Sequence, residues 1–296
     1  MDLLKNQLLR IQKTQDLHQS QMYAQTMSDM GWRVYGSENT YIFARRFGPI
    51  QLIKMQRANF PDWGLLRSIR NERFTMLIHL DQGLGAEIDP PKGFQKTEQH
   101  IGHTSTGMID LRPSLPHIQA TFNQETRRNI EKGLNNELRY ETLKFSETTP
   151  SQKKKIQDLQ NSWKAHRPHR DTHIPGFIDG ITKNSENTGR YFLAIDQKDQ
   201  VQAMIQYLET VDLGVYFLAC SSEKANKLKA PSALIWNAIA YAKTQKKVFF
   251  DFYGLFDDRA PKVYQYWRGF SEFKMRFHPI VVNYPLPLRL YPWNRL

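Results

Sequence analysis

The sequence has very little cysteine: Cys220 is the single example among 296 residues. One thiol cannot form an intrachain disulfide, so a reducing cytoplasm suits this chain. The apolar pair Leu218-Ala219 precedes the cysteine, and this favours a small buried side chain over a reactive nucleophile.

Long hydrophobic runs are also missing. The longest are Val248-Phe249-Phe250 and Ala238-Ile239-Ala240-Tyr241-Ala242, which are far too short to cross a bilayer. The start, Met1-Asp2-Leu3-Leu4-Lys5, soon turns into Gln- and Lys-rich sequence and does not resemble a signal peptide. We therefore expect a cytoplasmic protein.

The chain lacks residue-level repeats, low-complexity tracts and glycine-serine linkers. Its length allows one large or two medium domains, and 40% hydrophobic with 24% charged residues is ordinary for a globular protein. Without a flexible linker, two domains should pack closely and leave a cleft, which is the usual place for a small substrate.

Positive charge is present in excess, with 41 Lys and Arg against 29 Asp and Glu and a formal net charge of +12. A basic surface attracts nucleic acid, nucleotide-linked substrates or anionic lipid head groups. No cluster of basic residues is dense enough to decide, so a basic soluble protein without such a partner is the alternative.

The first half of the chain alternates helical and strand patterns. Spaced apolar residues predict one or two helices from Leu3 to Met30, with Gly31 as the stop. Turn residues then separate three strands, and a short helix and a fourth strand follow. These elements are expected at Trp32–Tyr35, Thr40–Arg45, Ile50–Met55, around Leu65–Ile69, and at Phe74–Leu80.

The second half repeats this order. Strands are predicted at Phe192–Ile195, Ala203–Glu209 and Leu213–Ala219, followed by a helix from a Ser232 cap to about Thr244 and a strand at Val248–Tyr253. Three meandering strands, a helix and a further strand form the central order of the GNAT acyltransferase fold. We therefore predict an α/β fold with two tandem GNAT-like domains packed around a cleft.

Several short motifs follow one another over nearly the whole chain. They are Gln19-Ser20 with Tyr23 and Gly31-Trp32, Ile109-Asp110-Leu111, Thr126–Lys132, Phe250–Gly254 and Gly269–Lys274. In this order they resemble the Fem family of peptidoglycan-bridge aminoacyltransferases, whose members share two tandem GNAT-like domains. The stretch from Glu141 to Arg190 is too short for the coiled-coil arm of some members, so the chain resembles the armless ones.

The resemblance implies two domains with different functions. Residues 1–122 with 280–296 would form an N-terminal domain that binds the precursor, and residues 123–279 a C-terminal domain on the aminoacyl donor side. It implies that an amino acid is transferred from aminoacyl-tRNA onto the amine of a peptidoglycan precursor stem peptide. Aminoacyl-tRNA would be a co-substrate, and no cofactor is expected. The expected partners are aminoacyl-tRNA and a lipid- or UDP-linked muropeptide, with peripheral contact at the inner face of the membrane and no DNA.

In such a reaction an amine attacks an ester that is already activated, so the enzyme aligns the substrates and stabilises negative charge on the carbonyl oxygen. The resemblance implies that Lys274 stabilises this negative charge. Spacing alone favours the alternative, a solvated lysine on a basic strand. The resemblance implies Asp89 as the base for the incoming ammonium. A turn aspartate before Pro90, with the proton lost to water or substrate, is the alternative.

The resemblance also implies groups that bind substrate. Arg57 and Arg167 would anchor the precursor diphosphate through paired hydrogen bonds, with ordinary surface arginines as the alternative. Tyr216 would line the cleft or simply pack.

Asp251, Tyr253 and Gly254 match the end of a family strand. We favour a structural role, in which a buried Asp251 carboxylate accepts amide hydrogen bonds and holds the following loop.

No metal site is predicted. His166, His169, His173 and Asp171 lie close in sequence, but Pro168 interrupts their segment and zinc needs convergent ligands.

Other features keep alternative functions open. Met27 stands where the family often has a lysine, Arg276–Pro279 replaces a glycine-rich end, and Gln82–Ala86 is an incomplete acyl-CoA phosphate loop. An N-acyltransferase that uses acyl-CoA or another donor on a different amine is one alternative, and a non-catalytic basic RNA-binding protein is another. The segment Tyr284–Leu288 is typical of proline-punctuated edge strands, with membrane contact as the alternative.

Overall fold

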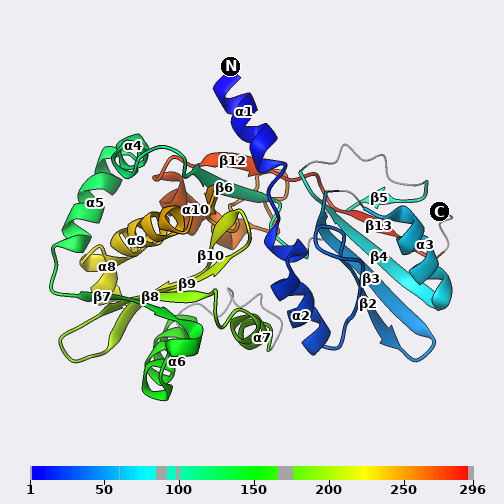
Figure 1. The fold of residues 1–296 in the computed structure, drawn as a ribbon, viewed down its shortest axis with the longest axis horizontal. Coiled ribbons are helices and arrows are strands. Elements are labelled where there is room, and N and C mark those ends of the chain that lie inside the picture. Colours follow the sequence, from blue (N-terminus) through cyan, green and yellow to red (C-terminus); the bar gives the residue numbers. More distant parts are fainter. Residues whose placement is uncertain (1, 60, 85–91, 98–100, 166–175, 293–296) are drawn as a thin grey trace.

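The computed structural model describes residues 2–59, 61–84, 92–97, 101–165 and 176–292. Two mixed sheets lie side by side, with helices packed on their faces (Figure 1). Helices α1 (Asp2–Ile11) and α2 (Gln21–Asp29) run along the junction of the sheets. This arrangement confirms the predicted α/β fold of two tandem GNAT-like units.

The first sheet contains the strands predicted for the first half of the chain. Its order is β1 (Arg33–Tyr35), β2 (Ile42–Phe47), β3 (Ile50–Ala58), β4 (Phe74–Gln82), β13 (Leu288–Leu290) and β5 (Gln95–Lys96). β3 and β4 are parallel because helix α3 (Trp63–Glu72) returns the chain across the sheet. Asp62 caps α3 by accepting the Leu65 amide at 2.8 Å.

The second sheet contains the meander predicted for the second half. Its order is β12 (Ile280–Asn283), β6 (Ser105–Asp110), β11 (Phe249–Asp251), β10 (Leu213–Ser221), β9 (Val201–Glu209), β8 (Arg190–Ile195) and β7 (Arg139–Lys144). β10 and β11 pair in parallel only between Leu213–Val215 and Phe249–Asp251. β10 then continues to Ser221 without this partner, so the two strands part and one edge of β10 is left unpaired by β11.

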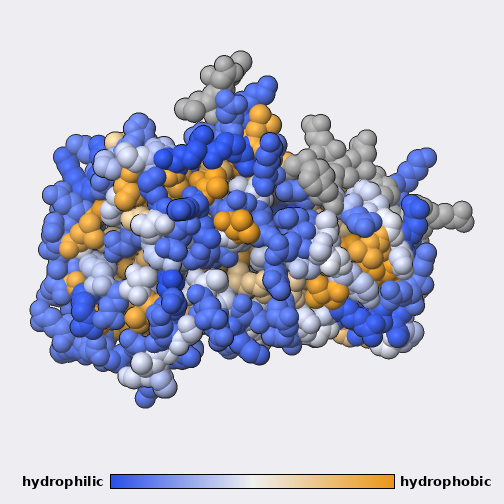
Figure 2. Space-filling model, in the orientation of Figure 1, coloured by the Kyte–Doolittle hydropathy of each residue, from blue (hydrophilic) through white to orange (hydrophobic). Residues whose placement is uncertain are grey.

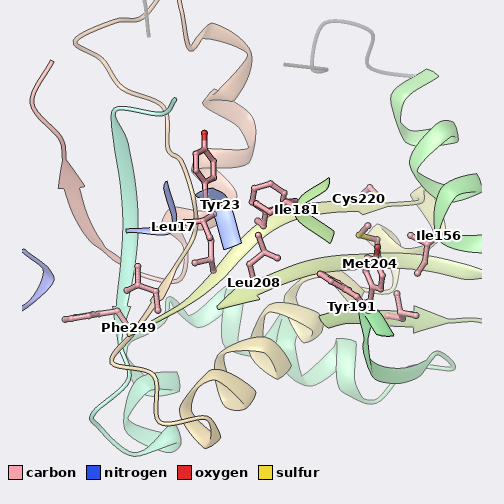
Figure 3. Close-up of a cluster of buried hydrophobic side chains, with 14 of the residues drawn as sticks. Leu17, Tyr23, Ile156, Ile181, Tyr191, Met204, Leu208, Cys220 and Phe249 are labelled. Carbon is pink, nitrogen blue, oxygen red and sulfur yellow. The ribbon is translucent and has the colours of Figure 1, made fainter. Parts of the chain in front are cut away.

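Helices cover both faces of the second sheet. They are α4 (Leu115–Thr121), α5 (Gln124–Leu134), α6 (Pro150–Ala165), α7 (Phe177–Asn184), α8 (Glu223–Lys227), α9 (Ala230–Thr244) and α10 (Arg268–Met275). Met204 and Leu208 of β9 belong to a buried cluster with residues of α6, α7 and α2, drawn in Figure 3. Ile205 and Tyr207 belong to a second cluster with α9. Alternate residues of β9 therefore enter different cores, as a strand buried on both faces requires.

The predicted order of elements is confirmed in both halves, and two details are wrong. Ser232 does not cap α9, because the helix begins at Ala230 after Lys229 and includes Pro231 in its first turn. Proline fits there because backbone N–H groups in the first turn of a helix have no partner within the helix, so the N–H that proline lacks is not missed. The C-terminal segment does not form an edge strand either, since β13 is hydrogen-bonded to β4 on one side and to β5 on the other.

The division into domains stays a prediction, and the hydrogen-bonded sheets divide the chain differently. β6 and β12 lie within the residues predicted for the N-terminal domain, yet both pair in the second sheet. The chain therefore passes from the first sheet to the second between β5 and β6, and returns to the first sheet between β12 and β13.

Hydrophilic residues cover most of the face shown in Figure 2, with apolar residues in separate groups. Within the described residues, no helix combines the length and the hydrophobicity that a bilayer span requires. The same residues contain no cluster of three or more His, Cys, Asp or Glu side chains arranged to hold a metal ion. The histidines at 166, 169 and 173 lie outside the described residues.

Candidate functional site

A cavity of about 830 Å³ lies between the two sheets. The first sheet and the N-terminal helices contribute His18, Tyr23 and Lys54 to its wall, and the second sheet contributes the unpaired edge of β10. Lys274 of α10 also lines it. The cavity therefore corresponds to the predicted cleft, and it lies where β10 and β11 separate.

A short loop after β11 forms one wall of this cavity. Tyr253 and Gly254 have φ angles of +52° and +102°, so the chain turns sharply after the strand. The buried Asp251 carboxylate accepts hydrogen bonds from the Thr106 hydroxyl and, at 2.8 Å, from the Tyr253 amide. Burial raises the pKa of Asp251 to about 6. This is the amide contact expected of Asp251, although its structural role stays a prediction.

Lys274 is attached to the same loop. Its Nζ donates hydrogen bonds to the carbonyl oxygens of Phe252 at 2.8 Å and Gly254 at 2.9 Å. The aromatic rings of Phe270 and Tyr216 lie 4.6 Å and 5.3 Å from Nζ. Burial lowers the pKa of Lys274 to about 7. The alternative of a solvated lysine on a strand is therefore wrong, because Lys274 is buried and lies on a helix.

The other predicted site residues separate into three groups. Tyr216 lines the cavity beside Lys274. Arg57 is buried elsewhere: its guanidinium donates to the carbonyl oxygens of Gln82 and His103 and stacks 3.5 Å above the ring of Tyr284. This geometry favours a structural role over diphosphate binding. Asp89 and Arg167 lie outside the described residues, so their roles stay predictions.

Lys54 is a second buried lysine in the cavity wall that the sequence interpretation missed. Its Nζ lies 2.7 Å from Gln56 Oε1, 3.4 Å from the Tyr23 hydroxyl and 3.6 Å from Met27 Sδ. The ring of Trp32 lies 4.8 Å from the same atom. Burial lowers the pKa of Lys54 to about 7. The available signal was a strand in which a lysine, two glutamines and an arginine are interspersed with apolar residues.

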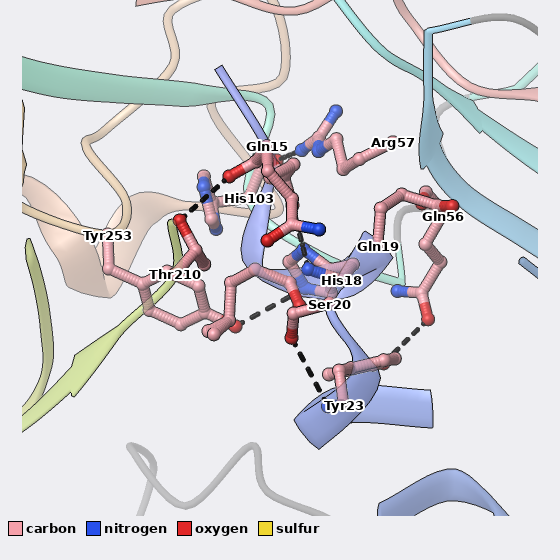
Figure 4. A network of polar contacts seen from close by, with 12 residues as sticks. Gln15, His18, Gln19, Ser20, Tyr23, Gln56, Arg57, His103, Thr210 and Tyr253 are labelled. Carbon is pink, nitrogen blue, oxygen red and sulfur yellow. Dashed lines mark hydrogen bonds and ion pairs between the residues drawn. The ribbon is translucent and has the colours of Figure 1, made fainter. Parts of the chain in front are cut away.

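His18 is another cavity residue that the sequence interpretation missed (Figure 4). Its Nδ1 lies 2.7 Å from Asp16 Oδ1, and its Nε2 lies 3.3 Å from the Tyr253 hydroxyl. Burial raises the pKa of Asp16, but its interactions and hydrogen bonds with His18 and the charge of Arg57 outweigh burial and hold that pKa well below its usual range. The signal was an aspartate two residues before a histidine, within the segment predicted to form one or two helices.

The parallel pair β10 and β11, the crossing helix α9 and the cavity where the strands part define a GNAT-like acyltransferase scaffold, present here in tandem. The chain belongs to the FemAB family, whose model matches residues 132–292. No curated protein sequence matches the chain.

Solved structures share the whole architecture. The crystal structure of FemX is similar with a TM-score of 0.75 and 12% identity, covering 97% of this chain and 96% of that one. The C-terminal domain of a putative lysylphosphatidylglycerol synthetase from Agrobacterium fabrum has a TM-score of 0.60 and 14% identity, covering 97% and 92%. A conserved protein of unknown function from Bacteroides thetaiotaomicron has a TM-score of 0.60 and 9% identity, covering 98% and 96%. At these identities the likeness concerns the fold.

Proposed function

We propose that this protein transfers an amino acid from aminoacyl-tRNA to the amine of a peptidoglycan-precursor stem peptide. Membership in the FemAB family supports a peptidoglycan-bridge aminoacyltransferase as the general class. The finer proposal rests on Lys274, a buried cation held at the wall of a cavity that both sheets enclose.

Lys274 has the arrangement that a charge-stabilising group needs. An ammonium group has three N–H donors, and two of them are directed at the carbonyl oxygens of Phe252 and Gly254. The third is available for the oxygen of an ester carbonyl in the cavity. Because the lysine is buried and already oriented, it stabilises an oxyanion more strongly than a solvated lysine would.

The cavity can hold both reacting groups. A volume of about 830 Å³ lies in the range of small-molecule sites and exceeds what one aminoacyl group needs. In the proposed arrangement the ester carbonyl lies at Lys274, and the acceptor amine approaches from the side of the first sheet. The positive net charge of +12 favours both a tRNA end and a diphosphate-bearing precursor. A lipid-linked acceptor would bring the protein to the inner face of the membrane.

The direct test is transfer of a labelled amino acid by purified protein. A panel of charged tRNAs is combined with lipid-linked and UDP-linked muropeptides, and labelled acetyl-CoA serves as a competing donor. We expect one charged tRNA to label a muropeptide. Labelling from acetyl-CoA alone, or RNA binding without transfer from any charged tRNA, would contradict the proposal.

A further inference from the structure

The histidine at the cavity wall is held in one orientation. Asp16 Oδ1 accepts a hydrogen bond from Nδ1 of His18, so we assign the proton of the neutral ring to Nδ1. Nε2 is then the acceptor nitrogen, and the Tyr253 hydroxyl lies 3.3 Å from it. Asp16 is itself fixed, because its carboxylate also accepts the His18 amide at 2.9 Å and the Tyr284 hydroxyl at 3.1 Å.

Tyr253 joins this histidine to the lysine site. It lies in the loop between Phe252 and Gly254, whose carbonyl oxygens hold Lys274. Figure 4 shows Tyr253 and His18 directed toward each other from the two halves of the molecule. An acceptor of protons and a stabiliser of negative charge therefore lie on either side of one tyrosine.

A further buried nitrogen at this wall has no partner within the described residues. It is Nε2 of His103, whose ring centroid lies 4.7 Å from that of Tyr253. A buried polar atom without a hydrogen bond is costly, so the wall beside Tyr253 carries an unsatisfied polar group.

A second buried His–Asp pair in the described structure provides a contrast. His79 Nε2 lies 2.9 Å from Asp81 Oδ1, but its Nδ1 accepts a hydrogen bond from Arg289 Nε at 3.2 Å. Neither residue is part of the cavity wall. The pair at His18 thus differs because its histidine is part of the cavity wall and its second nitrogen contacts another cavity residue, Tyr253.

We propose that His18 is the proton acceptor for the incoming primary ammonium, with Tyr253 as the relay and Asp16 as the positioning residue. This inference rests on the aminoacyl transfer proposed above and replaces Asp89 in the role of base. The ligand it assigns to this wall is an alkyl ammonium group of the acceptor.

In the proposed step, deprotonation of the ammonium precedes acyl transfer. The ammonium gives one proton to the Tyr253 oxygen while the Tyr253 hydroxyl proton passes to Nε2 of His18. The nitrogen lone pair then forms the C–N bond, and the carbonyl π pair moves to oxygen beside Lys274. On collapse the ester C–O bond breaks, and its electron pair leaves on the tRNA oxygen, which takes a second proton from nitrogen. The proton on His18 is released to solvent.

The groups around His18 are compatible with this role. Those that face it are Asp16, Tyr23, His103 and Tyr253, with Arg57 and Asp81 further away. Burial, together with Arg57 and His18, lowers the pKa of His103 well below its usual value, so His103 stays uncharged. Burial raises the pKa of Tyr253, so its hydroxyl passes a proton on only when it receives another.

The test compares transfer rates across pH for the wild type and His18→Gln, with the charged tRNA and muropeptide that react fastest. Glutamine can keep hydrogen bonds but cannot take the proton. We expect His18→Gln to lose about 10²- to 10⁴-fold in rate at neutral pH and to have a pH profile that differs from that of the wild type. His117→Gln, an exposed histidine of α4, is the matched control and should keep the wild-type profile. A His18→Gln profile equal to that of the wild type would overturn the proposal.

An acceptor that needs no deprotonation distinguishes a loss of proton transfer in His18→Gln from a loss of correct folding. The aminooxy analogue of the muropeptide amine is uncharged at neutral pH, so His18→Gln should acylate it at close to the wild-type rate. If the variant acylates the aminooxy and amine acceptors with the same large loss, His18 has a structural role and the proposal fails.

A measurement without turnover keeps the two proposals distinguishable. Nitrogen NMR of histidine-labelled protein should show the Nδ1–H form of His18 and a shift of its Nε2 resonance when methylammonium is added. Asp16→Asn should abolish the preference for that form. Absence of transfer by the wild type would reject the proposed function, whereas an Nε2 resonance that ignores methylammonium would reject the role of His18.

Discussion

Two lysines, Lys54 and Lys274, are buried at the wall of the same cavity from opposite sheets. Burial lowers the pKa of each to about 7. Lys54 is held by the amide oxygen of Gln56, and Lys274 is held by backbone carbonyl oxygens. The charges of Asp81 and Asp251 offset this burial only in part, so both cations cost stability, and such groups are often found where chemistry or binding requires them.

The free-energy cost of burying Lys54 should appear in the pH dependence of the free energy of unfolding. Between about pH 7 and 10 the unfolded chain holds the Lys54 proton and the folded protein does not, so the free energy of unfolding rises with pH. Lys54→Met should reduce this slope, leaving the part that Lys274 contributes, and should stabilise the protein at pH 7 by about 2–5 kcal/mol. Tyr23 and Gln56 stay satisfied in the variant because they bond to each other at 2.7 Å.

Urea unfolding at pH 7 and pH 10 measures this effect. Lys183→Met is the control, since that side chain is 76% exposed and its removal should leave the slope unchanged. A Lys54→Met protein that is less stable than the wild type at pH 7 would show that the buried ammonium is a net stabiliser.

Lys274 should matter to the chemical step more than to binding. Lys274→Met removes one oriented donor, and we expect kcat to fall about 10²- to 10³-fold with a small change in KM. Steady-state transfer assays with Lys227→Met, an exposed lysine of α8, provide the comparison. Unchanged kcat in Lys274→Met would remove this lysine from the mechanism.

Individual site residues were predicted correctly from the sequence where they belong to a recognisable motif. Lys274 closes a recognisable motif, and it does line the cavity. Lys54 and His18 lie in no such motif, and a lysine or histidine in a sequence is by default assigned to the surface or the core. Their place at the cavity depends on side chains that come from other elements.

At the scale of elements, the turn after β11 determines where Lys274 is held. Gly254 has a φ of +102°, and a Cβ added there would lie 2.8 Å from the Trp267 ring. Gly254→Ala should therefore destabilise the protein by about 1–3 kcal/mol and shift the carbonyl that accepts from Lys274.

Denaturant unfolding and the transfer rate together test this expectation. Gly269→Ala is the matched control for stability, because no atom lies within 4 Å of its added Cβ and alanine suits a helix better than glycine. Equal stability of the Gly254→Ala protein and the wild type would show that the loop tolerates a side chain.

Strands and helices were predictable because their apolar residues recur with the right period, as in β8 to β10 and α9. Ends of elements were less predictable. Ser232 has the chemistry of a cap, but Pro231 beside it already fits the first turn of the helix, which begins at Ala230. Both Ser232 and Pro231 are residues that favour the beginning of a helix, and the sequence pattern alone did not show which of them marks the first turn.

At the scale of the molecule, Tyr284 joins the two sheets. Its ring lies 3.5 Å from the Arg57 guanidinium, its hydroxyl bonds to Asp16, and its amide donates to the Thr104 carbonyl at 2.9 Å. We expect the wild type to unfold in one transition and Tyr284→Ala to lose about 3–5 kcal/mol and unfold in two.

Hydrogen exchange of β2 to β4 and of β8 to β10, measured against urea, follows each sheet separately. Tyr284→Phe removes only the hydroxyl contact and should lose about 1 kcal/mol while keeping one transition. Coincident loss of protection in both sheets of Tyr284→Ala would show that other contacts carry the coupling.

The exchange of strands between sheets could not be read from the sequence. β6 and β12 have ordinary strand patterns, and nothing in such a pattern identifies a partner that is distant along the chain. β13 follows Pro287, and a proline favours an edge position, yet the strand lies between β4 and β5 because the proline precedes the paired residues.

The position of β13 also affects how the protein is made. Its partner β4 ends at Gln82, and β13 begins at Leu288, 206 positions later. During translation the ribosome therefore releases β1 to β4 long before their missing neighbour exists. A nascent chain in this state exposes an unpaired strand, which attracts other chains. Efficient production in cells should thus depend on chaperones that shield the emerging N-terminal half until synthesis reaches β13.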